Sequence, residues 1–308
     1  MNQGDEQGIQ GAGGRGATGF RCSHETRRRN DPLLATASRT TGWLLIEEPG
    51  GWGRDALTES AIDPGIAATL AERTTKAEVR VQLIRRPRPR QRRDRTGQRA
   101  VAVVRSEPGG ETVSWHTVRA DHELLDVPLE AAGGKSEPIY LVCTHGNRDV
   151  CCAIRGRPVA DHLASHRPDQ TWETSHVGGH RFAANLVVLP HGLYYGQVTP
   201  DEALAVVKAY EAGQVIPGHL RGRSGYPSPV QAAEHFARVE LGETRLDALA
   251  AGQPVALDPD TWQVPLARDT GPVTVTVRAV PAVPVRMSCR DEQASPYNSF
   301  ELVALTTG

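Results

Sequence analysis

The chain has 308 residues, of which 39% are hydrophobic and 23% charged, and its formal net charge is −1. This composition is typical of a soluble globular protein with two or more domains. The balanced charge gives no reason to expect binding to nucleic acid or to a membrane, and no apolar run reaches the roughly 18 residues of a membrane helix. The five cysteines are odd in number and scattered, so we expect a cytoplasmic protein without a disulfide framework.

The chain divides into four predicted segments, and the fold class that they predict is α/β (α+β). The segments are a disordered Gly-, Gln- and Arg-rich tail (residues 1–30), an N-terminal α/β unit (31–135), a thioredoxin-like domain (136–215) and a C-terminal α+β segment (228–308). The Gly-, Pro-, Ser- and Arg-rich stretch between residues 215 and 228 is interpreted as a linker.

The N-terminal unit is predicted to contain one helix and a meander of strands. A strand near residues 43–46 precedes a helix over 64–76, and three β-prone runs follow, at 79–83, 100–104 and 112–115. This unit either packs beside the next domain or extends its sheet. The charge block RRPRPRQRRDR, residues 85–95, is interpreted as a solvated loop between two strands rather than a nucleic-acid site, because no aromatic residues interleave it.

The central domain begins with a strand and a helix. The apolar run at 138–142 predicts a buried strand that ends at Cys143, and the pattern from Asp149 onward predicts a helix with Cys152 in its first turn. Pro158 falls inside this pattern, so the helix is expected to start late or to kink. A weaker strand at 172–175 leads to the next polar residues.

The second half of this domain predicts a hairpin and a helix. Pro190-His191-Gly192 separates two apolar runs, as in a tight hairpin. Thr199 as N-cap, Pro200 and Glu202 predict a helix that starts with a capping box and ends at Gly213. The resulting order of strand, helix, strand, strand, helix predicts a thioredoxin-like unit.

The C-terminal segment carries no motif to which chemistry can be attached. It predicts helices at 229–241 and 246–251 and strands at 273–280 and 299–304. Cys289 stands alone in this segment and is interpreted as structural, and Cys22 near the N-terminus is interpreted as a small buried or partly exposed thiol.

Four side chains of the central domain are candidate metal ligands. They are Cys143, Cys152, His176 and His180. Two thiolates and two imidazoles suit zinc or an iron–sulfur centre and poorly suit magnesium or calcium, which prefer oxygen. Gly178-Gly179 between the histidines lets the backbone approach whatever they bind. His145, Arg148 and Arg181 are candidate supporting residues that would stabilise a thiolate by hydrogen bonding or charge.

The sequence around these ligands resembles that of a known family. CAIRGRPVADHL and VVLPHGLYYGQVTPDEALAVV are similar to segments of thioredoxin-like [2Fe–2S] ferredoxins, in which four cysteines hold the cluster. CTHGNRDVCC together with HVGGHRFAAN resembles the sucrase/ferredoxin-like family, whose members use two cysteines and two histidines. The resemblance implies that Cys143, Cys152, His176 and His180 ligate a [2Fe–2S] cluster. It further implies a one-electron carrier rather than a catalyst with its own substrate, serving redox partner proteins that the sequence does not identify.

Two alternatives remain open from the residues themselves. A structural zinc ion would use the same four ligands, although the C-x₈-C spacing is wider than the usual C-x₂₋₄-C. A thiol–disulfide protein would use the adjacent pair Cys151–Cys152, although this pair lacks the C-x-x-C spacing and leaves the histidines unexplained.

Overall fold

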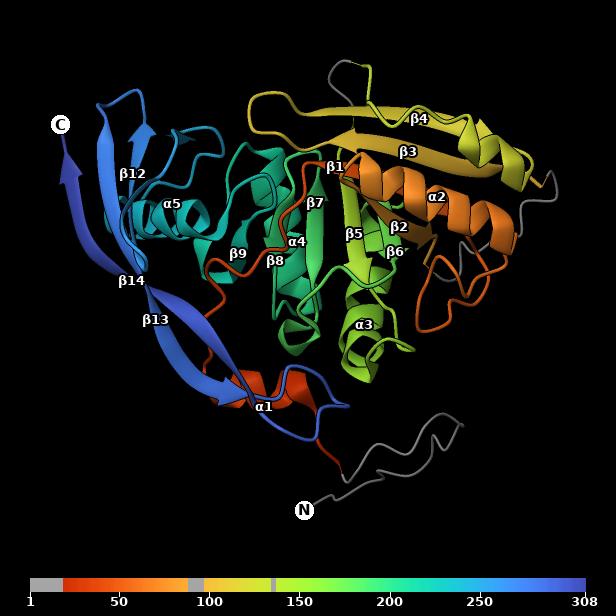
Figure 1. Cartoon of the computed structure of the whole chain (residues 1–308), viewed down its shortest axis with the longest axis horizontal. Coiled ribbons are helices and arrows are strands. Elements are labelled where there is room, and N and C mark those ends of the chain that lie inside the picture. Colours follow the sequence, from red (N-terminus) through yellow and green to blue (C-terminus); the bar gives the residue numbers. More distant parts are fainter. Residues whose placement is uncertain (1–18, 88–96, 134–136) are drawn as a thin grey trace.

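The computed structural model describes residues 19–87, 97–133 and 137–308, so most of the charge block at 85–95 lies outside the described residues. Within these described ranges, five α-helices and fourteen strands form an α+β fold with two sheets, which confirms the expected fold class (Figure 1). The helices are α1 (Cys22–Arg28), α2 (Pro64–Lys76), α3 (Val150–His166), α4 (Pro200–Glu211) and α5 (Ser228–Leu241). The strands are β1 (Gly42–Glu47), β2 (Val79–Arg85), β3 (Arg99–Arg105), β4 (Thr112–Val118), β5 (Ile139–Cys143), β6 (Thr171–Thr174), β7 (Leu186–Leu189), β8 (Leu193–Tyr195), β9 (Leu220–Arg223), β10 (Ala250–Ala251), β11 (Val255–Asp258), β12 (Thr261–Ala267), β13 (Val273–Val285) and β14 (Ser295–Thr307).

The N-terminal unit extends the sheet of the central domain. The larger sheet has nine strands in the order β4-β3-β1-β2-β6-β5-β7-β8-β9. The two units join where β2 pairs antiparallel with β6, with Ile84 opposite Thr174. The site region therefore belongs to one continuous sheet rather than to a separate domain tethered by a linker.

Both units have the same strand arrangement. In each, the first two strands are parallel, a helix connects them, and the third and fourth strands continue antiparallel beside the first. The spatial order is β2-β1-β3-β4 in one unit and β6-β5-β7-β8 in the other. The N-terminal unit thus repeats the strand topology of the thioredoxin-like unit, but its first strand ends at Glu47 where the other ends at Cys143.

The large sheet curls, so strands that are distant in the sheet order meet across one apolar face. Trp43 of β1 contacts Tyr194 of β8 with their ring centroids 6.2 Å apart, although four strands separate β1 from β8. Trp115 of β4 stacks on Trp172 of β6 at 5.9 Å. Trp43, Trp172 and Tyr194 are buried in one apolar cluster, whereas Trp115 is 42% exposed, so the core beneath the site is apolar.

The local signals of the central domain were interpreted correctly. Thr199 and Glu202 form both bonds of the capping box of α4, and the hairpin joins β7 to β8. Helix α3 begins at Val150 with the Asp149 carboxylate as its N-cap, and it continues through Pro158 rather than starting late. These caps satisfy backbone N–H groups that would otherwise lack partners, which fixes where each helix starts.

Two predictions between residues 215 and 251 were wrong. The expected linker contains β9, the ninth strand of the large sheet, which pairs with β8 and carries the fully buried Arg221. The expected short helix at 246–251 is absent, and Ala250 and Ala251 instead pair with β12 as β10. Both segments are ordered by partners far away in the sequence, which a local pattern does not reveal.

The expected disordered tail was wrong for residues 19–30. Helix α1 occupies Cys22–Arg28, and its Cys22, Ser23 and Thr26 side chains are buried. This segment packs against η2 (His180–Phe182), a 3₁₀ turn of the site region, so tertiary contacts compensate for its polar composition.

None of the helices in the described part of the chain has the length and apolar character of a membrane-spanning helix.

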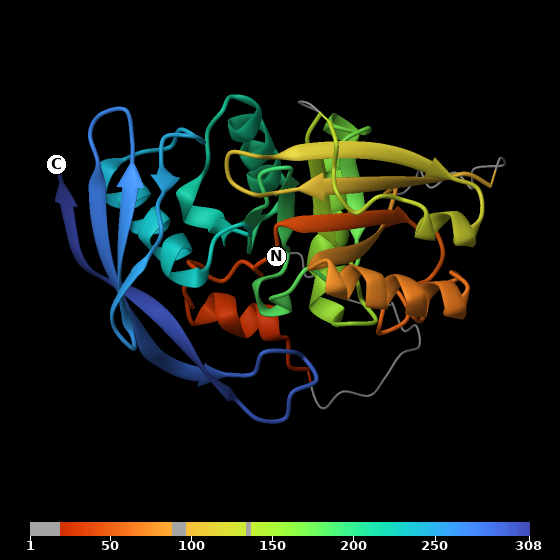
Figure 2. The same ribbon diagram turned by 45° about the horizontal axis from the view of Figure 1, so that its top comes forward.

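The C-terminal segment forms a second sheet with a long projecting hairpin. Strands β13 and β14 pair over thirteen residues each, and α5 packs on their inner portion. The outer part of the hairpin, residues 280–299, which we call the arm, extends to α1 at the opposite end of the chain (Figures 1 and 2). Arg29 donates to the carbonyls of Val283 and Pro284 and so attaches the arm to the N-terminal segment.

Candidate metal centre

Three of the four predicted ligands converge. The Nδ1 atom of His176 lies 3.9 Å from the sulfur of Cys143 and 3.8 Å from the sulfur of Cys152. The donor atoms of these three residues all lie within 4.8 Å of one another. His180 is adjacent, since its ring centroid lies 4.8 Å from that of His176. The structure therefore brings all four predicted side chains to one place.

Secondary structure presents the cysteines from two directions. Cys143 is the last residue of β5, and Cys152 lies in the first turn of α3, and both are fully buried. The N-terminus of a helix carries partial positive charge, which favours a thiolate over a thiol. Gly156 allows α3 to lie this close to β5, because a Cβ at that position would be 2.1 Å from the Cys143 carbonyl oxygen.

The two cysteines shift each other's pKa in opposite directions. The pKa of Cys143 lies well below its ordinary value because the Cys152 thiol donates to its sulfur, with further stabilisation from His176 and from the backbone N–H of His145. Correspondingly, the hydrogen bond with Cys143 and burial raise the pKa of Cys152. The lowered pKa of Cys143 favours its thiolate, which is the form that binds metal.

The loop that carries the histidines requires glycine. Gly178 and Gly179 have φ of 98° and 70°, values that residues with a Cβ rarely adopt. A Cβ on Gly179 would also lie 2.4 Å from the guanidinium of Arg221. Both glycines are therefore needed to turn the chain between His176 and His180.

Arg221 of β9 stabilises this loop by hydrogen bonds. Its guanidinium donates to the Gly178 carbonyl at 3.0 Å and to Asn185 Oδ1 at 2.8 Å. Burial lowers the pKa of Arg221 to about 10, and the negative charge of Cys143 is among the influences that oppose this shift. None of the hydrogen-bond partners found for its guanidinium among the described residues is a carboxylate, so its positive charge acts on the site. We did not predict this residue from sequence, because it lies in the stretch interpreted as a linker.

His145 positions the backbone at His176, just beyond the end of β6. Its Nε2 lies 2.6 Å from the Gly53 carbonyl, so it donates there, and Nδ1 accepts from the His176 backbone N–H at 3.2 Å. Burial lowers the pKa of His145, which favours the neutral ring that this bonding pattern requires. His145 thus connects the Gly-rich loop at residues 50–53 to the backbone of His176. Arg181, by contrast, forms a buried ion pair with Asp31 at 3.2 Å, so its charge is compensated.

The donor set fits a metal centre. Nδ1 of His180 is buried without a hydrogen-bond partner in the described part of the chain, and the pKa of His180 is lowered by burial. An unpartnered buried nitrogen costs about 1–3 kcal/mol unless something binds it, and a neutral imidazole is the form that ligates. His176 and His180 are half-buried whereas the cysteines are sealed, so the histidine side of the site faces solvent.

The adjacent cysteines face different sites. While Cys152 points to Cys143 and His176, the Cys151 sulfur lies 3.2 Å from that of Cys289. Successive residues of a helix project about 100° apart, which explains the divergence. This geometry does not favour a Cys151–Cys152 disulfide. Cys289, which we interpreted as standing alone, lies together with Cys22 and Cys151, so that interpretation was wrong. Cys22 is buried, as expected.

Comparison with known proteins agrees with the family resemblance. The sequence profile described as sucrase/ferredoxin-like matches residues 33–222, which include all four predicted ligands and Arg221. The chain belongs to the sucrase/ferredoxin-like family. The matched region ends within β9, so it covers both units of the large sheet and leaves out α1 and the arm.

Three curated relatives share one printed name, altered inheritance of mitochondria protein 32. The protein from Meyerozyma guilliermondii is 30% identical over 100 residues, covering 28% of this chain and 35% of the relative. The proteins from Candida glabrata and Debaryomyces hansenii are 29% and 26% identical over 103 and 121 residues, covering 29% and 36% of this chain and 33% and 41% of the relative. The chain thus matches about a third to two-fifths of their length. No solved structure matches.

Proposed function

We propose that this protein is a [2Fe–2S] electron carrier whose cluster is held by Cys143, Cys152, His176 and His180. The observation that carries the proposal is the convergence of these four side chains, with a lowered pKa at Cys143 and an unpartnered nitrogen at His180. Membership of a ferredoxin-like family supports the same conclusion. When bound, the cluster would accept and release a single electron.

The protein residues would set the potential and the access to the site. The N-terminus of α3 and the His145 backbone N–H stabilise negative charge on the cysteine side. Arg221 places a buried positive charge beneath the histidine loop and therefore favours the reduced, more negative state. Burial of both cysteines excludes water from their sulfur atoms.

The half-buried histidines would provide the contact with solvent and with a redox partner. Nδ1 of His176 faces the sulfur atoms, which leaves Nε2 to carry a proton toward the exposed side. A proton held at that nitrogen would be bound more tightly after reduction, because the added electron lowers the positive charge of the site. Electron transfer would then be coupled to proton uptake.

A structural zinc ion is the second candidate, and one observation favours it. The separations of 3.8 and 3.9 Å between His176 Nδ1 and the two sulfurs are close to the roughly 3.6 Å between N and S ligands of one tetrahedral zinc ion. In that case His180 would be the fourth ligand.

Iron analysis of a matched pair of variants tests the proposal. Cys152→Ser is expected to abolish bound iron, whereas Cys151→Ser, one residue away with its sulfur turned from the site, is expected to retain it. Iron and acid-labile sulfide would be measured after anaerobic reconstitution. Iron loss in both variants, or in neither, would contradict the proposed ligand set.

A further inference from the structure

The three cysteines outside the proposed cluster site form a cluster of their own. The sulfur of Cys289 lies 3.2 Å from that of Cys151 and 3.6 Å from that of Cys22. Asp149 completes the group, with its carboxylate oxygens 3.7 and 3.9 Å from the Cys22 sulfur. One donor atom from each of the four residues lies within 4.8 Å of every other. All five cysteines of the chain are free thiols, so this group contains no disulfide.

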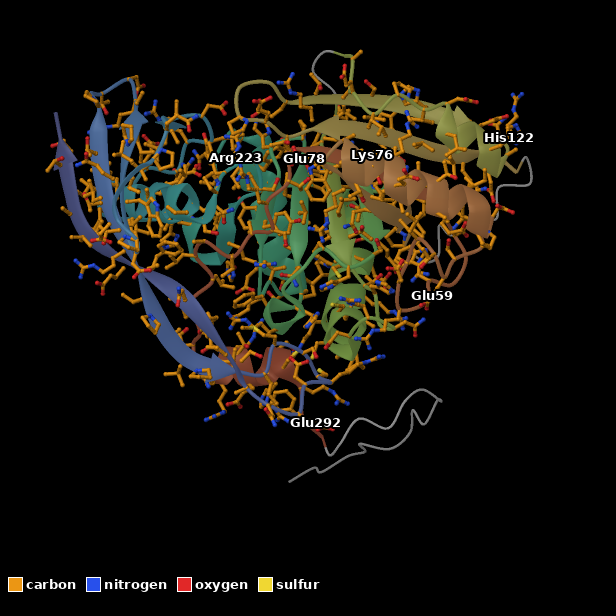
Figure 3. All side chains as sticks on the ribbon, viewed as in Figure 1. Glu59, Lys76, Glu78, His122, Arg223 and Glu292 are labelled. Carbon is orange, nitrogen blue, oxygen red and sulfur yellow. The ribbon has the colours of Figure 1, made fainter. Side chains whose placement is uncertain are left out.

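The four residues come from three distant parts of the chain. Cys22 lies at the start of α1, Asp149 and Cys151 at the start of α3, and Cys289 in the turn of the arm. The views agree that the arm reaches α1, and Glu292, three residues beyond Cys289, lies at this end of the molecule (Figures 1 to 3). Three thiols from segments separated by more than 100 residues do not meet through local sequence preference.

The group is buried and preorganised. Cys22, Asp149 and Cys151 are each about 1% exposed, and Cys289 is half-buried. The Asp149 carboxylate accepts from the backbone N–H groups of Cys151 at 2.9 Å and Cys289 at 2.8 Å, which fixes its orientation. The Cys22 backbone N–H is 3.4 Å from the Cys289 sulfur, a contact that stabilises a thiolate.

From this geometry we propose a second metal site, in which Cys22, Cys151, Cys289 and Asp149 bind one zinc ion. Zinc–sulfur bonds of about 2.3 Å at tetrahedral angles place ligand sulfurs about 3.8 Å apart, and a sulfur and a carboxylate oxygen about 3.6 Å apart. The observed separations of 3.2–3.9 Å need only small shifts to reach these values. Three sulfurs this close together can share a single ion, and thiolate-rich donor sets select zinc over magnesium or calcium.

The ion would attach α1, through Cys22, and the arm, through Cys289, to α3. Without it, the turn of the arm is held by a few contacts, among them Arg290 to the Asn147 carbonyl at 2.9 Å and Arg286 over the Phe20 ring. Zinc would therefore act structurally, closing the arm over α1 and α3. This inference does not rest on the proposed electron-carrier function, because it uses none of the four residues of that site.

Metal analysis of the full-length, iron-reconstituted protein tests the proposal. The wild type is expected to hold one zinc per chain, and Cys289→Ser is expected to lose it while its iron content is unchanged. Ser288→Ala is the matched control, because the Ser288 side chain bonds Asp291 rather than the thiols, and it is expected to keep its zinc. Cys143→Ser is expected to lose iron and keep zinc, which separates this proposal from the cluster proposal.

Limited trypsin digestion of the wild type gives a second test that needs no variant. Arg286 and Arg290 flank Cys289, so removing zinc with a chelator is expected to speed cleavage at these residues at least tenfold, and adding zinc back is expected to restore protection. Three results would overturn the proposal: reduced wild-type protein that binds no added zinc, zinc that is lost with Cys143→Ser but not with Cys289→Ser, or a Cys151–Cys289 disulfide in alkylated protein.

Discussion

Replacing Gly179 by alanine tests how tightly the histidine loop is packed. Gly179 has φ of 70°, and its added Cβ would meet three atoms of the Arg221 guanidinium at 2.4, 2.8 and 3.0 Å. Gly213 has a nearly identical φ of 72°, but a Cβ there would meet nothing within 4 Å. The two alanine variants therefore share the backbone strain and differ in the steric clash.

The size of each effect follows from this difference. The left-handed conformation costs an alanine about 1–2 kcal/mol, which is the whole expected cost of Gly213→Ala. Gly179→Ala adds overpacking against a buried arginine that donates four hydrogen bonds, about 1–3 kcal/mol more. At about 2 °C per kcal/mol for a chain of this size, the unfolding midpoint is expected to fall by about 2–4 °C for Gly213→Ala and about 4–10 °C for Gly179→Ala.

Circular dichroism melts and iron analysis would be run on both variants. Because His180 follows Gly179 directly, Gly179→Ala is also expected to lose iron, whereas Gly213→Ala, in the turn after α4, is expected to keep it. Equal shifts of the midpoint, with iron retained by both, would refute the packing of Arg221 against the histidine loop.

Four further predictions follow from the site and its surroundings. Arg221→Met removes a buried positive charge and is expected to lower the midpoint potential in protein-film voltammetry; an unchanged potential would mean that the charge is screened. The double variant His176→Cys/His180→Cys adds two thiolate charges and is expected to lower the potential further; a value at or above that of wild type would mean that the histidines are not ligands. The wild-type potential is expected to fall with rising pH, approaching about 59 mV per unit, and a flat response in the same voltammetry would argue against proton coupling. Glu211→Gln is expected to cost about 1 kcal/mol of the free energy of unfolding at neutral pH, because a hydrogen bond from Arg167 lowers the pKa of Glu211. This stabilisation is present above the ordinary pKa of 4.5 and is lost as the pH falls through the lowered folded-state pKa. Melts in which the variant and the wild type differ equally at acid and neutral pH would contradict this prediction.

Local signals in the sequence were sufficient for the helices and strands that carry the candidate site. The capping box of Thr199 and Glu202, the hairpin around Pro190-His191-Gly192 and the run ending at Cys143 each depend on neighbours within a few residues. The resemblance then named four candidate ligands, and the structure places their side chains together. Agreement at this level is expected where propensity, turn chemistry and apolar pattern point to the same element.

The features that could not be predicted from the sequence depend on contacts between segments that are not neighbours in the sequence. Arg221 lies in β9, which pairs with β8 and whose Gly- and Arg-rich sequence is typical of a loop. Cys22 and Cys289 are 267 residues apart, and their proximity follows from the way in which the arm folds back over α1. Polar or Gly-rich segments such as these are ordered by tertiary partners, which no local period encodes.

The absorption and electron paramagnetic resonance spectra of aerobically purified protein, with iron and sulfide analysis, test directly whether the protein carries a [2Fe–2S] cluster. We expect a red-brown protein with about two iron and two acid-labile sulfide per chain, and a paramagnetic signal that appears on reduction by one electron. A colourless protein that takes up no iron during anaerobic reconstitution, and whose zinc is lost with Cys143→Ser, would contradict it.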